Sequence, residues 1–140
     1  MNPNIDVLEN SIQKTNELLK KIEADLEWED RKNQAYQALR VVLHALRDRM
    51  TVEDAVHLSA QLPLFIKGVF FDGWKPNEVP IKMNRAEFVQ RVAREFRLDV
   101  EGGIEIVIQV VLNDLFDTVD PAEKIKVMDT LPRDIAELFM

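Results

Sequence analysis

The stretch AQLPLFIKG, residues 60–68, and the stretch DTLPRDIAE, residues 129–137, each place a proline directly after a leucine within an otherwise amphipathic helical pattern. Proline has no amide hydrogen, its ring crowds the carbonyl four residues back, and it disfavours helical angles in the residue before it. A helix must therefore end or kink at each Leu-Pro step. Because proline is favoured at the start of a helix, each step predicts a short new helix that faces another wall of the core.

The two Leu-Pro steps belong to a longer internal match. Aligning residues 41–70 with residues 110–139 without a gap gives nine identities in thirty positions, where composition alone would give about two. We interpret this match as a tandem repeat of helical units. It also bears on GIEIVIQVV, residues 103–111, which is β-branched enough to form a buried strand. Because this segment aligns with a region of helical pattern, we predict a helix there.

The whole chain is predicted to be one all-α domain over residues 1–140. Its four glycines and six prolines supply too few turns for a fold of many short strands. We predict a compact bundle of six to eight helices built from two tandemly repeated helical units, each with a Leu-Pro helix break. The first unit covers residues 1–72 with an N-terminal helix at about 5–28, a connector covers 73–83, and the second unit covers 84–140.

Composition and charge exclude several classes of function. Lys and Arg number 18 against 25 Asp and Glu, a formal charge of −7, which disfavours nucleic acid and anionic membrane surfaces. The chain has no cysteine, so thiolate catalysis and thiolate metal sites are absent. The amino terminus lacks the pattern of a signal peptide, and no apolar run has the length of a membrane span. We expect an acidic cytoplasmic protein that does not enter the membrane.

Four segments are similar to a known family. They are NELLKKIEADLEW at 16–28, AYQALRVVLHALRDRMTVEDAVHLSAQLPLFIKGVFFDGWKP at 35–76, FVQRVAREF at 88–96 and LPRDIAELF at 131–139. Together they closely resemble the bacterial family called domain of unknown function 2267, from about residue 12 to the carboxyl end. The resemblance implies a small all-helical bacterial protein with two related halves, and it implies no activity. The pair Gly102-Gly103 departs from the more helix-favouring residues expected at that point.

One polar cluster is a weak candidate site. Arg40, His44 and Arg47 share a face of the second predicted helix, away from its leucine stripe. We expect this face to be solvated. A metal site that joined His44 to its neighbours on the next helix would require two such faces to converge, and its ligands would be His44, Asp48, Glu53 and His57. We assign no catalytic residue and no cofactor.

The same helix raises the alternative of DNA binding. Residues 31–50 contain one acidic residue, Asp48, and five basic residues: Arg31, Lys32, Arg40, Arg47 and Arg49. The segment TVEDAVHL at 51–58 follows, and its turn-then-helix pattern is similar to a helix-turn-helix. The aligned segment at 110–128 has largely lost the basic residues. We therefore favour a solvated helix face whose arginines pair with acidic neighbours.

An aromatic cluster is the candidate contact surface. Phe70, Phe71 and Trp74 crowd the end of the proline-led helix, where they either fold back over the bundle, with Trp28 as their partner, or form a contact patch. The stripe from Leu8 to Leu26 has coiled-coil spacing, which we interpret as core packing.

The sequence therefore favours a non-enzymatic protein-protein interaction or regulatory module. Its partner would be an unknown protein or a second copy of the chain in a homodimer. The alternative is a small-molecule or metal-binding protein, or an enzyme, with its site between the two helical units.

Overall fold

The computed structural model describes residues 3–100 and 102–139, and within them the chain is helical without a strand. The elements follow in the order α1 (Pro3–Asp25), α2 (Lys32–Arg49), α3 (Val52–Ser59), α4 (Leu64–Phe71), the 3-10 helix η1 (Pro76–Glu78), α5 (Arg85–Glu95), α6 (Ile104–Phe116), α7 (Pro121–Thr130), α8 (Arg133–Ala136) and the 3-10 helix η2 (Glu137–Phe139). The predicted all-α bundle is confirmed, and the β-branched segment at 103–111 forms most of α6.

Local side-chain chemistry sets the helix ends. The Thr51 side chain accepts a hydrogen bond from the Asp54 amide at the start of α3. Asp120 caps α7, with proline as the first helical residue, so both predicted caps are present. The first helix ends three residues before the predicted position, because the chain turns through the left-handed region at Glu27 and Asp30.

Both Leu-Pro steps break the chain into a new helix, as predicted. Pro63 and Pro132 are extended, with ψ of 150° and 143°, and each precedes its helix by one residue. The helices on either side of the two steps begin 69 residues apart, which is the offset of the internal match. Before the steps, α3 begins at 52 and α7 at 121; after them, α4 begins at 64 and α8 at 133. In addition, α2 contacts α6 and α3 contacts α7. The duplication stays a prediction, and these matching boundaries support it.

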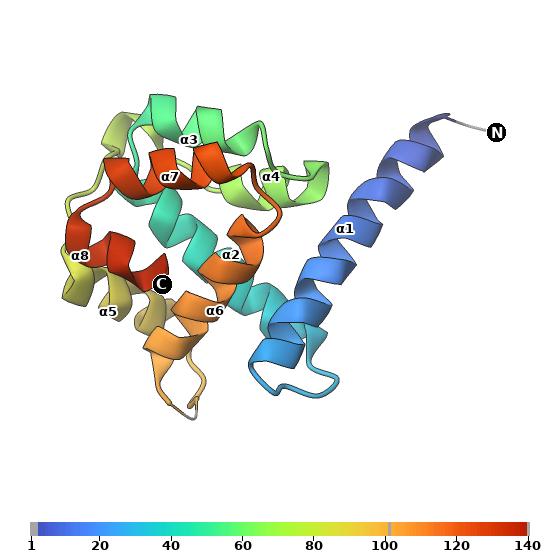
Figure 1. Cartoon of the computed structure of the whole chain (residues 1–140), viewed down its shortest axis with the longest axis horizontal. Helices are drawn as coiled ribbons and strands as arrows, with labels where there is room; N and C mark the ends of the chain where they lie inside the picture. The colour runs from blue at the N-terminus through green and yellow to red at the C-terminus, as the bar shows by residue number, and fades with distance from the viewer. Residues whose placement is uncertain (1–2, 101, 140) are drawn as a thin grey trace.

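Helix α2 lies at the centre of the bundle. It contacts α1, α4, α5 and α6 (Figure 1). From Ala38 to Asp48 every residue except Arg40 is buried. A helix that is buried on nearly all sides forms the interior of a domain. The largest buried side chains around it include Phe70, Phe88 and Leu112.

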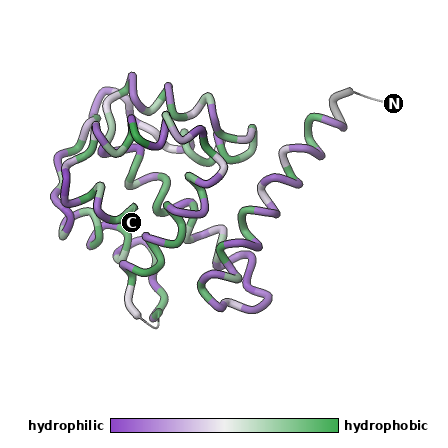
Figure 2. The backbone as a smooth tube through the Cα atoms, in the orientation of Figure 1, coloured by the Kyte–Doolittle hydropathy of each residue, from purple (hydrophilic) through white to green (hydrophobic). Residues whose placement is uncertain are grey.

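Helix α1 is packed along only part of its length. Leu18, Leu19 and Ile22 are buried against the body, whereas Leu8 and Ile12 are more than half exposed. Figure 1 shows the amino-terminal half of α1 projecting away from the other helices. Hydrophobic residues recur along this projecting half, as Figure 2 shows. Among the described helices, none combines the length and the apolar composition that a membrane span needs.

A buried carboxyl group lies where α1 meets α6. Lys21 Nζ is 2.6 Å from Asp117 Oδ2 and 3.8 Å from Asp114 Oδ1. Asp114 is buried, and its Oδ2 atom has no hydrogen-bond partner among the described residues. Burial raises the pKa of Asp114 to about 7, and the neighbouring Asp25 carboxyl acts in the same direction while Lys21 opposes it. The folded chain therefore favours neutral Asp114.

This raised pKa predicts how stability depends on pH. Neutral Asp114 contributes to the free energy of unfolding. This contribution is complete below the ordinary aspartate pKa of about 4 and is lost as the pH rises through about 7. Asp114→Asn cannot ionise, so at pH 8 it should raise Tm by about 5 °C, a gain of about 1–2 kcal/mol. The difference in Tm between the two proteins in circular dichroism should shrink as the pH is lowered from 8 and should vanish only near pH 4. Asp129→Asn, an exposed change on α7, should not raise Tm, and a lower Tm for Asp114→Asn at pH 8 would contradict this interpretation.

Candidate polar cleft between α2, the connector and α5

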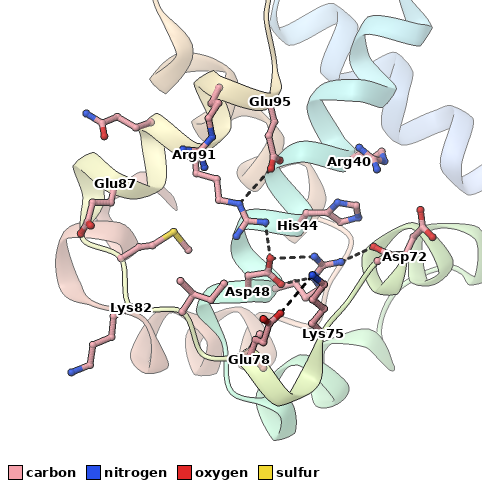
Figure 3. Close-up of a pocket in the computed structure, with 17 residues that line it drawn as sticks. Arg40, His44, Asp48, Asp72, Lys75, Glu78, Lys82, Glu87, Arg91 and Glu95 are labelled. Carbon is pink, nitrogen blue, oxygen red and sulfur yellow. Dashed lines mark hydrogen bonds and ion pairs between the residues drawn. The ribbon is translucent and has the colours of Figure 1, made fainter.

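A cleft of about 700 Å³ lies between α2, the connector at 73–83 with the preceding Asp72, and α5 (Figure 3). Eleven charged side chains line it together with His44. The basic residues are Arg40, Arg47, Lys75, Lys82, Arg91 and Arg94, and the acidic residues are Asp48, Asp72, Glu78, Glu87 and Glu95. Because charged side chains make up most of its lining, we treat this cleft as the candidate site.

The structure brings the predicted polar cluster into this cleft. Arg40, His44 and Arg47 all line it. The prediction that this face is solvated is wrong, because His44 and Arg47 are only 6% and 4% exposed. Helix α4 and the connector cover the face that the sequence pattern left polar. A signal was present in the nearly continuous apolar run VVLHAL at 41–46, which is typical of a helix buried on several sides.

The Arg47 guanidinium forms the floor of the cleft. Its Nε and Nη2 atoms donate to the two Asp48 carboxylate oxygens at 2.8 and 3.2 Å. Its Nη1 atom donates to the carbonyl oxygens of Phe70 and Asp72 at 3.0 and 2.8 Å. The last carbonyls of a helix have no partner within the helix and carry partial negative charge. Arg47, in the last turn of α2, therefore caps the carboxyl end of α4.

Asp48 extends this network to α5 and the connector. Its Oδ2 atom accepts a 2.6 Å bond from Arg91 Nη2, and its backbone oxygen accepts a 2.7 Å bond from the Ile81 amide. Burial alone would raise the pKa of Asp48, but hydrogen bonds from the two arginines hold that pKa below its usual value. Asp48 is consequently a carboxylate at neutral pH, and one charged network joins α2, α4, α5 and the connector.

His44 is a second tie between α2 and α4. Its Nε2 atom lies 2.7 Å from the carbonyl oxygen of Val69. A carbonyl can only accept, so Nε2 carries the proton. Burial lowers the pKa of His44, and the charges of Arg47 and Arg40 lower it further, against the opposing effect of the Val69 carbonyl. His44 is thus neutral at neutral pH.

The cleft has more free positive than free negative groups. Of its five carboxylates, Asp48, Glu78 and Glu95 form ion pairs and Glu87 belongs to a capping box with Asn84; only Asp72 has no such partner among the described residues.

In contrast, the guanidinium groups of Arg40 and Arg94 form no ion pair with any described carboxylate. The same holds for Lys82, which points away from the Asp48 carboxylate in Figure 3. The cleft is therefore suited to an anionic group, although the chain as a whole is acidic.

The predicted aromatic patch folds back onto the bundle. Phe70 is fully buried, whereas Phe71 and Trp74 are half-buried and pack against the core. The Phe71 ring centroid lies 5.1 Å from that of Phe70 and 4.9 Å from that of Trp74. The predicted partnership with Trp28 is wrong, because Trp28 stacks on Phe96 at 5.9 Å.

The suggested metal ligands do not converge. His44 and Asp48 lie at the cleft, but His57 is exposed and its Nδ1 atom is 2.7 Å from Glu123 Oε2 on α7. Among the described residues, no group of three or more histidine and carboxylate side chains could hold a metal ion.

The basic segment 31–50 does not present one exposed face. Arg47 is buried in the network described above, and the Nε atom of Arg49 donates to the Met83 carbonyl at 3.4 Å. DNA binding through this helix stays a prediction to which the geometry adds no support.

The network predicts that replacing two different aspartates by asparagine has very different effects on the free energy of unfolding. Asp48→Asn leaves the buried Arg47 without its carboxylate and should lower the free energy of unfolding by about 2–4 kcal/mol in urea at pH 7. Asp117, which the internal match aligns with Asp48, is exposed and pairs with Lys21, so Asp117→Asn should cost less than about 1 kcal/mol.

The pH dependence gives a second check on Asp48. Because the pKa of Asp48 is lowered in the folded chain, ionised Asp48 contributes to the free energy of unfolding above about pH 4, and this contribution is lost at lower pH. The difference between wild type and Asp48→Asn should therefore shrink on acidification. Equal costs for Asp48→Asn and Asp117→Asn at pH 7 would contradict the role given to the network.

Comparison with known proteins gives a family and no activity. A family model described as "Uncharacterized conserved protein (DUF2267)" matches residues 15–138. No curated protein matches the chain. The matched region includes α2, the connector and α5, and so the whole cleft. Because the match covers most of its length, the chain belongs to the DUF2267 family of uncharacterized conserved proteins.

Proposed function

We propose that this chain is a non-enzymatic binding protein that holds a small anionic molecule, one with carboxylate or phosphate groups, in the cleft between α2, the connector and α5. The observation that carries the proposal is the pair of arginines, Arg40 and Arg94, which line the cleft without a carboxylate partner among the described residues. Guanidinium groups bind carboxylates and phosphates through paired, charge-assisted hydrogen bonds.

The rigid floor of the cleft supports binding. Arg47 and Asp48 are buried and fully engaged with each other and with the backbone of the covering segments. Groups held in this way lose little conformational entropy when a ligand arrives, which lowers the cost of binding. The floor also fixes the distance between α2 and α5, the helices that carry Arg40 and Arg94.

The state of the ionisable groups favours binding over catalysis. His44 is neutral and uses its Nε2 proton in the bond to Val69. Asp48 is held as a carboxylate by two arginines. A general acid or base must exchange protons near the working pH. Since these two groups are each held in one state, the cleft is better suited to holding a charged molecule than to transforming it.

The position of the cleft supports a regulatory role for the bound molecule. Helix α2 belongs to the first predicted unit and α5 to the second, so a ligand on both arginines would bridge the two units. A ligand that binds only when α2 and α5 are packed together stabilises that packing, and the gain rises with the logarithm of its concentration. We therefore place the ligand site between the units, and we assign the interaction function to a separate surface.

Binding is tested with citrate and pyrophosphate as probes. For a dissociation constant of about 1 mM, a probe at about 10 mM should stabilise the fold by about 1.4 kcal/mol, which raises Tm by about 4 °C. The double variant Arg40→Gln/Arg94→Gln should lose most of this rise relative to chloride at equal ionic strength. Lys126→Gln removes an exposed charge on α7, away from the cleft, and should keep the full rise. Equal rises in both variants, or no rise in the wild type, would refute the proposal.

A further inference from the structure

The projecting half of α1 and a groove beside it lie on one surface of the molecule. The groove has a volume of about 410 Å³ and is lined on α1 by Ile12, Thr15, Asn16 and Leu19 and elsewhere by Lys32, Asn33, Tyr36 and Phe65. None of these residues lines the polar cleft. The groove is therefore independent of the site proposed for the anionic ligand.

The apolar stripe of α1 extends beyond the body that covers it. The stripe has coiled-coil spacing from Leu8 through Ile12 to Leu19. Leu19 is 7% exposed, whereas Ile12 and Leu8 are 54% and 56% exposed. Leu64 and Phe65 at the start of α4 are also about half exposed. A cluster of this kind on one face marks an interaction surface.

From these features we propose that the occupant of the groove is α1 of a second copy of this chain, laid antiparallel in a two-fold symmetric dimer. A two-fold interface uses the same patch on both partners, so the patch must complement itself. Here one chain carries both the projecting apolar ridge and the apolar groove, and Ile12 belongs to both. A two-fold axis midway between Ile12 and Asn16 sets Ile12 against Asn16 and Glu9 against Leu19 of the other copy, and so places each ridge in the other groove.

The two ends of the groove determine which charged residues of a second α1 would lie near Lys32. Its two ends are identified by hydrogen bonds: the Phe65 amide donates to Ser11 Oγ, and the Arg31 amide, just before Lys32, donates to Glu23 Oε2. Phe65 therefore lies at the Ile12 end of the groove, and Lys32 lies at the Leu19 end. An antiparallel α1 from the second copy brings its amino-terminal turns to the Lys32 end.

A pair of opposite charges would then form twice across the dimer. Glu9 lies seven residues before Asn16, which lines the groove, so the two share one side of α1. In the antiparallel arrangement Glu9 of one copy approaches Lys32 of the other. Both residues are exposed, and neither forms an ion pair with a described residue. This complementarity fixes the register of the two helices and favours a second copy over a partner of unrelated sequence.

The dimer is tested by sedimentation equilibrium on the full chain over a wide range of concentrations. The wild type should show a monomer–dimer equilibrium. Ile12→Glu puts a charge beside the proposed axis and should raise the dissociation constant by at least about tenfold. Ile125→Glu is the matched control, because Ile125 is an equally exposed isoleucine on α7, and it should dimerise like the wild type. Circular dichroism should show both variants folded, since both side chains lie at the surface.

A charge exchange tests the register and the identity of the partner. Glu9→Lys and Lys32→Glu should each weaken the dimer about threefold to tenfold, and the double exchange should restore it to within about twofold. A wild type that stays monomeric would overturn the proposal and leave the groove to a partner of another sequence. A dimer that is indifferent to Ile12→Glu, or a double exchange weaker than either single variant, would overturn it as well.

Discussion

The structure depends on a buried guanidinium that must be fully hydrogen-bonded. Arg47 lies at the carboxyl end of the central helix α2, where burial of an unpaired charge would cost several kcal/mol. It is satisfied only when Asp48 is beside it and the last carbonyls of α4 lie above it. Asp48 in turn holds α5 through Arg91 and the connector through the Ile81 amide. The need to hydrogen-bond buried Arg47 therefore positions α2, α4, α5 and the connector, and the cleft lies between them.

The two proposed binding surfaces follow from different physical causes. In the cleft, most carboxylates form ion pairs or hydrogen bonds within the chain. Arg40 and Arg94 have no carboxylate partner among the described residues, and they give an acidic protein a local site for anions. At α1 the cause is incomplete burial: the helix is longer than the body it packs on, and its apolar stripe continues into solvent. Because the cleft and the groove share no residue, a variant in one surface should leave the other unaffected.

Much of the fold could be predicted from the sequence, because local chemistry determines it. The Leu-Pro steps, the caps at Thr51 and Asp120 and the helix at 103–111 depend on backbone constraints or on the internal match. The candidate site was predictable only in part. Helical geometry places Arg40, His44 and Arg47 on one face, and all three line the cleft. The burial of His44 and Arg47, however, depends on how α4 folds back over α2, which helical periodicity alone does not report. Likewise, the stacking of Trp28 on Phe96 joins segments far apart in the chain.

Hydrogen exchange on wild type and Arg47→Met tests most directly whether this one network holds the cleft together. Amides of α4 and of the connector, including Ile81, should be protected in the wild type. In Arg47→Met they should exchange at least about tenfold faster, a loss of at least about 1.4 kcal/mol of local stability, and they should lose more protection than the amides of α6 and α7. Unchanged protection of α4 and the connector in the variant, or a uniform loss over the whole chain, would contradict the account.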